Sequence, residues 1–151
     1  MSWNFKNGEV LNELSEFPDN TFGFVYKITH IPTGKSYIGK KVLMHNRKVK
    51  LTKKDLELYE NTKGRKPSYK RISKESDWKT YWGSNKLLLE LIKTEPNENF
   101  SRDIITMAPT KKLLTYYETK YLFVYQVLEK PDEFFNDNVL GKFFTKDLEA
   151  Q

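Results

Sequence analysis

The sequence predicts an α+β fold, in which a small three-stranded mixed β-sheet is flanked by helices and a basic segment, residues 48–77, is inserted after the second strand. Residues 22–41 read as two short strands around a turn, and residues 100–107 read as a third strand. Residues 110–129 carry apolar side chains at three- and four-residue steps, as an amphipathic helix does. A chain of 151 residues can bury one core, so a single domain is expected, with residues 1–21 as an N-terminal arm.

Composition excludes several classes of protein. No apolar run approaches the roughly 18–20 residues that span a bilayer, and the first ten residues lack the apolar segment of a signal peptide. A cytosolic location and no membrane partner are therefore expected. The chain has no cysteine, which leaves no disulfide, thiol nucleophile or cysteine-based zinc site.

The positive charge is concentrated in one part of the chain. The net charge is +6, and the stretch from Lys40 to Lys86 has fifteen Lys or Arg against five Asp or Glu. The remainder is therefore about four units acidic. A basic segment in an otherwise acidic chain favours a surface that binds a polyanion, although a solvated loop with incidental lysines is the alternative.

The stretch from Phe22 to Lys41 is the predicted hairpin. Its first strand alternates aromatic and β-branched residues, and Pro32-Thr33-Gly34 has the residues of a tight turn. Tyr26 and Tyr37 lie eleven positions apart, one on each strand. The register decides whether they share a face of the sheet, and the sequence alone leaves that open.

The hairpin resembles the signature of the GIY-YIG nuclease family, and the chain is most similar to phage-encoded freestanding, homing-type members. The second tripeptide is intact as Tyr37-Ile38-Gly39. The first is Phe24-Val25-Tyr26, with Phe24 where the family has glycine and Gly23 one step earlier. The run ESDWKTYWGSNKLL at 75–88 is similar to the phage enzymes, and the resemblance extends over residues 22–141.

Two positions after the hairpin also follow the family. Lys40 directly follows the glycine, and Arg47 stands eight residues past it, where the family has an arginine on a helix. A fixed guanidinium can bind a phosphate at two points. The resemblance therefore implies that Arg47 binds the scissile phosphate. The alternative is a surface arginine in a basic region.

One family position departs from the pattern. Where the family usually has histidine or tyrosine, one turn beyond the arginine, this chain has Leu51. His45, Tyr69 and Tyr81 are the candidates for that role.

The basic insertion is predicted to contain a short helix, 53–60, capped by Thr52, followed by a loop at 61–68. Its cations alternate with aromatic residues, which suits binding to a nucleic-acid backbone. Since phosphates carry no base identity, weak sequence reading is expected. The residues expected to contact DNA are Lys40, Lys41, Arg65, Lys66, Lys70, Arg71 and Lys79.

Two later helices are predicted. The first runs over 85–93 with Ser84 as its N-cap. On the second, Glu118 falls on the shoulder of the apolar stripe beside Leu114 and Leu122, and a partly desolvated carboxylate needs a partner. A lysine such as Lys111, in an ion pair at the surface, is one candidate for that partner. The resemblance implies another, because the family carries a single metal-binding glutamate on the helix after the third strand.

The aromatic–asparagine pair that the family often has after this helix is matched by Phe135-Asn136, with Asn138 as a neighbouring candidate. An asparagine amide there could hold catalytic residues or a water in place. An ordinary Asx turn is the alternative.

The resemblance implies a divalent-metal-dependent DNA endonuclease that hydrolyses phosphodiester bonds by nicking or by double-strand cleavage. Glu118 would be the only protein ligand of one Mg²⁺ or Mn²⁺ ion. Tyr26 would act as general base or orient the attacking water, and Tyr37 would hold the network. Lys40 and Asn136 complete the expected catalytic set, in a monomer or homodimer.

Two other functions remain open from the sequence. A nucleic-acid-binding protein that keeps the fold without catalysis is favoured by Phe24 and Leu51 in place of the family residues. A basic adaptor for an acidic protein partner would show no salt-sensitive DNA binding, whereas both nucleic-acid functions predict a steep loss of binding with salt.

Overall fold

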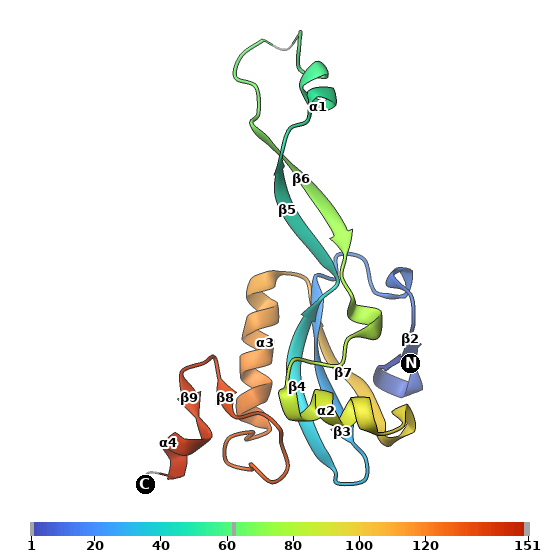
Figure 1. Ribbon diagram of the computed structural model, residues 1–151, viewed down its shortest axis with the longest axis vertical. Helices are drawn as coiled ribbons and strands as arrows, with labels where there is room; N and C mark the ends of the chain where they lie inside the picture. Colours follow the sequence, from blue (N-terminus) through green and yellow to red (C-terminus); the bar gives the residue numbers. More distant parts are fainter. Residues whose placement is uncertain (1, 62, 150–151) are drawn as a thin grey trace. The chain divides into compact units, whose positions relative to one another are not determined.

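The computed structural model describes residues 2–61 and 63–149 and contains two compact units (Figure 1). The first unit consists of Met1–Leu43 and Asp77–Gln151, and the second is Met44–Ser76. The second unit corresponds to the insertion predicted at 48–77, with slightly earlier bounds. Each unit is described by itself below.

The first unit holds a five-stranded sheet in the order β2-β1-β7-β3-β4. β3 pairs antiparallel with both β4 and β7, and these are the three predicted strands. The predicted α+β class is confirmed, and β1 and β2 extend the three predicted strands to five. The sheet is mixed because Asn4 of β1 pairs in parallel with Asp103 of β7. The bounds are β1 (Trp3–Asn4), β2 (Val10–Leu11), β3 (Gly23–His30), β4 (Lys35–Val42) and β7 (Phe100–Ala108).

Helices and short strands complete the first unit. The α-helices are α2 (Lys86–Thr94), α3 (Lys111–Val124) and α4 (Thr145–Glu149). The 3₁₀ turns are η1 (Lys6–Gly8), η2 (Leu14–Glu16), η3 (Trp78–Thr80) and η4 (Asn97–Asn99), and a two-stranded ladder pairs β8 (Asn138–Val139) with β9 (Phe143–Phe144). None of the helices in the described residues is both long and apolar enough to cross a membrane.

The register of the hairpin places both signature tyrosines on one face. Tyr26 lies opposite Gly39, and Ile28 lies opposite Tyr37. Residues directly opposite each other share a face, and so do residues two apart on a strand. Tyr26 and Tyr37 are therefore diagonal neighbours, with ring centroids 6.2 Å apart.

The two faces of the sheet carry different cores. On one face, Val25 and Ile38 belong to a buried cluster with Leu114 and Leu122 of α3, the helix beside the sheet in Figure 1. On the other, Phe24 is fully buried, with its ring centroid 4.9 Å from that of Trp3.

The packing of Phe24 explains its presence at the glycine position of the family. Its ring also stacks on Phe17 of the N-terminal arm at 5.9 Å between centroids. Trp3 and Phe17, both within residues 1–21, are thus buried in the core and surround Phe24 with aromatic rings.

Two helix boundaries differ from the sequence prediction. α3 ends at Val124 rather than at 129, because Gln126 has a φ of 56° and cannot continue a right-handed helix. Val127 and Leu128 are nevertheless buried, which is why the apolar pattern extends past the end of the helix. α2 is capped by Asn85, which accepts a hydrogen bond from the Leu88 N–H at 3.0 Å, and not by Ser84.

The second unit is a two-stranded antiparallel ribbon with one short helix. β5 (Met44–Lys50) pairs along its whole length with β6 (Tyr69–Glu75), and α1 (Lys53–Glu57) follows β5. Thr52 caps α1 as predicted, although α1 ends at Glu57, short of the predicted 60. Arg47 lies on strand β5, so the expectation that it stands on a helix is wrong. The predicted loop at 61–68 has no helix or strand at residue 61 or at residues 63–68. Thr62 lies outside the described residues.

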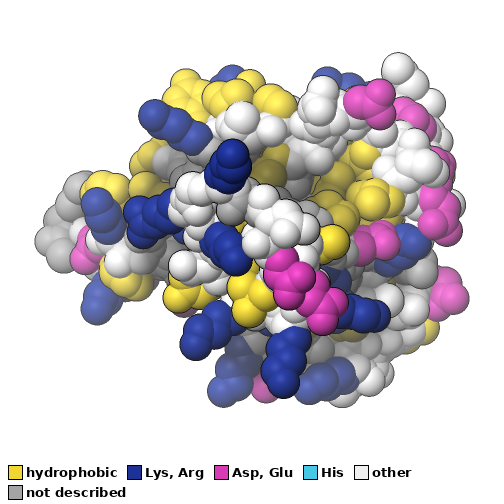
Figure 2. Space-filling model, turned by 90° about the horizontal axis from the view of Figure 1, so that it is seen from above, with side chains coloured by type: hydrophobic (Ala, Val, Ile, Leu, Met, Phe, Trp, Pro, Cys, Tyr) yellow, Lys and Arg dark blue, Asp and Glu magenta, His cyan; other side chains and the backbone are white. Residues whose placement is uncertain are grey.

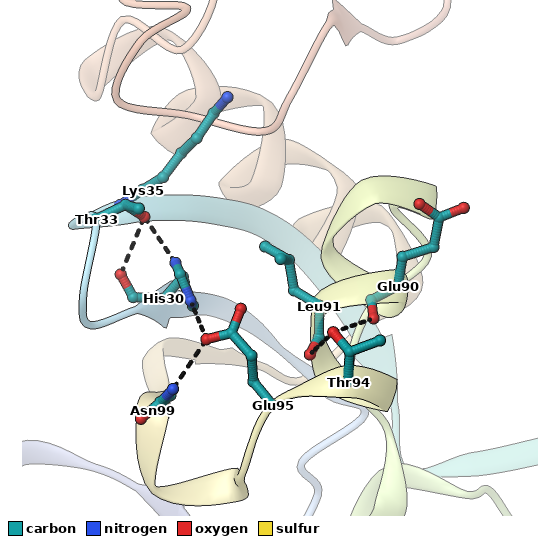
Figure 3. Close-up of polar contacts among 8 residues, drawn as sticks. All are labelled: His30, Thr33, Lys35, Glu90, Leu91, Thr94, Glu95 and Asn99. Atoms are coloured by element: carbon teal, nitrogen blue, oxygen red, sulfur yellow. Dashed lines mark hydrogen bonds and ion pairs between the residues drawn. The ribbon is translucent and has the colours of Figure 1, made fainter.

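A polar cluster joins the hairpin turn to the end of α2 (Figure 3). Nε2 of the buried His30 lies 2.8 Å from Glu95 Oε1, and its Nδ1 lies 2.7 Å from Thr33 Oγ1. Asn99 Nδ2 donates to the same Glu95 oxygen at 2.8 Å. The His30 bond lowers the pKa of the Glu95 carboxyl. This cluster, His30-Thr33-Glu95-Asn99, is called the turn clamp below.

Candidate active site

A pocket of about 550 Å³ opens beside β4, the edge strand of the sheet. Its walls come from β4, from the loop before α2, from α3 and from the segment after α3. The lining residues include Tyr37, Ser84, Asn85, Glu118, Asn136 and Asp137. Four segments that are distant in the sequence thus meet at one strand edge, and three of the predicted catalytic residues line the pocket.

Gly39 provides the space in which the Tyr26 hydroxyl lies. A Cβ atom at position 39 would stand 2.4 Å from the Tyr26 hydroxyl oxygen, closer than any ordinary contact. The Tyr26 side chain is buried, and the missing side chain at position 39 lets its hydroxyl reach toward strand β4. The glycine of the second tripeptide is therefore required by a close approach of side chain to backbone.

Tyr81 is one of the three candidates for the family's histidine or tyrosine position, and it lies next to Tyr26. Its ring packs edge-on against the Tyr26 ring, with 5.8 Å between the ring centroids. Of the three candidates for the family's histidine or tyrosine position, Tyr81 is the one that the structure brings to Tyr26. His45 and Tyr69 belong to the second unit.

Ser84 is a site residue that the sequence prediction missed. Its Oγ lies 3.0 Å from the Tyr37 hydroxyl oxygen, and both side chains line the pocket. The sequence gives it the role of N-cap because serine is a favoured capping residue. Asn85 takes that role instead and leaves the serine for the tyrosine.

Tyr26 and Tyr37 both have a pKa above the ordinary value of a tyrosine. Burial raises the pKa of the Tyr26 phenol well above 10, and Tyr81 and Tyr37 add to the rise. Burial also raises the pKa of Tyr37, against a smaller lowering by the hydrogen bond to Ser84. The negative charge of Glu118 makes a smaller contribution to both pKa shifts.

Glu118 stands half-buried on α3, as its position on the shoulder of the stripe predicts. Burial raises the pKa of its carboxyl, while the charge and the backbone N–H of Lys40 act to lower it. Lys40 Nζ donates a hydrogen bond to Thr115 Oγ1 at 2.9 Å, one turn before Glu118. The Lys40 side chain therefore reaches α3 near Glu118, although neither Lys40 nor Thr115 is among the residues that line the pocket.

Asn136 fixes the edge strand at the pocket. Its Oδ1 accepts a hydrogen bond from the Ile38 N–H at 3.0 Å, and its Nδ2 donates to the Ile38 carbonyl at 2.8 Å. The side chain is buried and imitates a further strand paired to β4. Of the two roles considered, the structure gives Asn136 the positioning of the residues around Tyr37 and Gly39.

Arg102 is a second feature that the sequence did not reveal. Its guanidinium is buried between the rings of Trp3 and Trp82, at 4.4 and 4.6 Å from their centroids. It donates hydrogen bonds to the carbonyl oxygens of Tyr81 at 2.8 Å and Lys79 at 3.0 Å. Burial lowers its pKa to about 10. Arg102 thus holds the segment that carries Tyr81.

The predicted DNA-contacting residues fall into two groups. In the first unit, Lys41 forms an ion pair with Asp77 and stands 4.0 Å above the Tyr81 ring, and Lys79 pairs with Glu13 at 2.9 Å. In the second unit, Lys70 pairs with Asp55 at 2.9 Å. The remaining ones, Arg65, Lys66 and Arg71, are exposed in the second unit, as Arg47 is. Lys and Arg side chains stand out over much of the surface seen in Figure 2.

The donor set suits one weakly held hard cation. Within residues 2–61 and 63–149 there is no group of three or more His, Cys, Asp or Glu arranged to hold a metal ion. Glu118 offers a carboxylate in the pocket, and the positive charge of Lys40 acts to lower the pKa of that carboxyl. A site with one carboxylate leaves most positions for water and substrate oxygens, as Mg²⁺ sites commonly do.

The signature hairpin, the glutamate helix and the asparagine at the strand edge together define a domain of the GIY-YIG class. A family model described as "Putative endonuclease segE, GIY-YIG domain" matches residues 3–139, which is most of the chain. The chain belongs to this family of GIY-YIG nuclease domains. Searches of curated proteins and of solved structures return no match.

Proposed function

We propose that the chain is a DNA endonuclease that hydrolyses phosphodiester bonds with one divalent ion, Mg²⁺ or Mn²⁺, bound by Glu118. The observation that carries the proposal is the pocket beside strand β4, which Tyr37, Glu118 and Asn136 line, with the buried Tyr26 packed against Tyr37 at 6.2 Å between ring centroids. Membership of a nuclease family supports the reaction class.

Glu118 would hold the ion through its carboxylate, which lies in the pocket beside β4. A bound divalent ion supplies Lewis-acid stabilisation of the negative charge that develops on the phosphate and the leaving 3′ oxygen. The pocket has room for a phosphate group and its waters.

Tyr26 would act as a hydrogen-bond donor. Because burial raises its pKa well above 10, the phenol keeps its proton at neutral pH in the metal-free protein. Of the two roles considered, orienting the attacking water fits this environment better than accepting a proton. Tyr37, bonded to Ser84, would complete the same network at the pocket wall.

The cations would bind and position the DNA. Lys40 is bonded to Thr115 of α3, one turn before Glu118, where it would offset phosphate charge near that carboxylate. Arg47 on β5 is an exposed cation and remains a proposed phosphate ligand. Because one such site cuts one strand, a double-strand break would require a homodimer or two successive visits by a monomer.

The test is incubation of supercoiled plasmid with the protein and Mg²⁺ or Mn²⁺. We expect nicked or linear product that EDTA abolishes, together with retained DNA binding in EDTA. Binding without cleavage under any divalent ion, on varied DNA, would instead favour the non-catalytic nucleic-acid-binding protein. Cleavage that persists undiminished in EDTA would contradict the metal requirement.

A further inference from the structure

The second unit carries more positive charge than the whole chain. Met44–Ser76 contains eleven Lys or Arg and four Asp or Glu, a net charge of +7, whereas the entire chain has +6. The first unit is therefore one unit negative. The polyanion-binding character belongs to the ribbon, and the shape of the ribbon determines how it can meet a duplex.

The two faces of the ribbon differ. On one face Val49 and Ile72 are half-buried and Lys70 is bonded to Asp55 of α1. The cations Arg47 and Lys74 on this face are exposed. The other face has four cross-strand pairs. One of them is Met44 with Glu75, in which Met44 is half-buried, and the other three consist of six side chains that are all exposed. These three exposed pairs are Asn46 with Ser73, Lys48 with Arg71, and Lys50 with Tyr69. This set of six residues is called the outer face below.

The central pair of the outer face is electrostatically unfavourable in the free protein. Lys48 and Arg71 stand directly opposite each other, and like charges in that position destabilise a ribbon. No carboxylate is bonded to either of them within the part of the chain that the structure describes. An anionic ligand, or acceptor groups such as guanine O6 and N7, would relieve this repulsion.

The neighbouring pair is suited to base edges. Ser73 Oγ donates to Asn46 Oδ1, which fixes the amide and leaves its nitrogen as a donor for an acceptor on a base. Arginine and asparagine are the side chains that most often read guanine and adenine in the major groove. Their grouping on one exposed face goes beyond what phosphate binding alone requires.

The dimensions fit the major groove. Two strands lie about 4.8 Å apart, so a ribbon with its side chains fills a groove about 12 Å wide and exceeds one of about 6 Å. The seven residues of β5 span about 20 Å at 3.3 Å per residue. At 3.4 Å per base pair, that length covers about six base pairs.

We propose that the ribbon enters the DNA major groove and reads a site of about six base pairs through its outer face, with Arg71 and Asn46 as the specificity-determining residues. This inference rests on the proposed function, because it names how the same DNA substrate is selected. It requires no cleavage, so it can be tested separately from the chemistry.

The experiment is binding of the full chain, in EDTA, to duplexes with a randomised ten-base-pair window, followed by sequencing of the bound fraction. Wild type is expected to enrich a motif of about six base pairs. Arg71→Ala and Asn46→Ala are each expected to lose preference at one or two positions by about fivefold to a hundredfold. The matched control Lys54→Ala, an exposed cation on α1, should weaken binding to all sequences alike.

Dimethyl sulfate protection on the enriched duplex then identifies the groove, because it methylates guanine N7 in the major groove. Protection of N7 within the motif is expected, and its loss in Arg71→Ala supports the assignment. No enriched motif, a motif unchanged in both outer-face variants, or unprotected N7 atoms throughout would overturn the proposal. Absence of plasmid cleavage alone would contradict the proposed function and leave this result standing.

Discussion

At the scale of single residues, the site depends on the contact between Gly39 and Tyr26. The tyrosine hydroxyl occupies the space that a side chain at position 39 would take. Its buried ring has Trp3, Tyr37 and Tyr81 around it, so it has little freedom to move aside. A one-carbon change at the glycine should therefore displace a proposed catalytic group.

Gly39→Ala is expected to lower stability by about 1–3 kcal/mol, the usual cost of overpacking. It should lower the rate of DNA cleavage by about a hundredfold, since a displacement of about 1 Å is that costly in an active site. Urea unfolding and plasmid nicking measure the two effects.

Tyr26→Phe supplies the control, because it removes the hydroxyl oxygen that a Cβ at position 39 would meet first. The double variant should be more stable than the sum of the single changes predicts. Strictly additive losses would mean that the two side chains do not compete for this space.

Glu118 provides the other test at this scale. A metal ligand must be a charged carboxylate, whereas a buried charge at this position lowers the stability of the folded protein. Burial raises the pKa of its carboxyl in the folded protein, so the folded state favours the neutral form. This favourable contribution is complete at pH below the unfolded pKa and is lost as the pH rises through the folded one. Glu118→Gln should therefore raise the melting temperature at pH 7, and the difference should disappear by about pH 4.

The same variant separates a metal ligand from a structural glutamate. Mn²⁺ at millimolar concentration should raise the melting temperature of wild type and have less effect on Glu118→Gln, because a ligand stabilises only the state that binds it. Equal Mn²⁺ shifts in both proteins would place the ion elsewhere.

At the scale of elements, local sequence patterns predicted which helices and strands form. They were less successful in predicting where these elements end and how the strands pair. The hairpin, the third strand and the exposure of Glu118 follow from short-range periodicity. The end of α3 did not, because Val127 and Leu128 continue the apolar pattern after the backbone has left the helix. The cap of α2 was wrong by one residue, because Ser84 and Asn85 are both good capping residues.

The strand identity of residues 44–50 was beyond local reasoning. This stretch is mostly polar and gains its partner β6 about twenty residues later, so its structure depends on a non-local pairing. The roles of Tyr81, Ser84 and Arg102 at the site were hidden for the same reason. Each acts through contacts with residues at least twenty positions away.

The turn clamp gives an element-scale prediction. Because the His30 bond lowers the pKa of Glu95, the carboxylate stabilises the folded state at pH above its unfolded pKa, near 4.3. That contribution is lost as the pH falls through the lower folded value. Glu95→Gln should therefore lower the melting temperature at pH 7, with a difference that shrinks below about pH 4.

Glu98→Gln is the matched control for the turn clamp, since Glu98 is exposed on the adjacent turn η4. Circular dichroism melts of both variants from pH 3 to pH 7 make the comparison. A destabilisation by Glu95→Gln that stays constant across this range would show that the charge of Glu95 is not involved.

At the scale of the whole molecule, charge is divided between the two units. The second unit holds a net charge of +7 and the first is slightly negative, although the first carries the proposed active site. We therefore expect the second unit to provide most of the salt-dependent DNA affinity. The sequence predicted this segregation directly, because charge counts need no knowledge of the fold.

Replacing Arg65 and Lys66 together by Gln should reduce the slope of log K against log salt by up to about 1.8, at about 0.9 per lost phosphate contact. The matched pair Lys130→Gln and Lys142→Gln, both exposed in the first unit, should leave the slope nearly unchanged. Fluorescence anisotropy with a labelled duplex in EDTA measures both. Equal reductions by the two pairs would contradict a ribbon-centred interface.

The most direct test of the central claim is single-turnover plasmid cleavage by wild type and Glu118→Ala, at enzyme concentrations that give equal DNA occupancy measured in EDTA. Wild type should nick or linearise the plasmid with Mg²⁺ or Mn²⁺. Glu118→Ala should bind equally well and cut at least a thousandfold more slowly, about 4 kcal/mol of lost transition-state stabilisation. Equal cutting by both proteins would show that Glu118 is structural and that the catalytic site lies elsewhere.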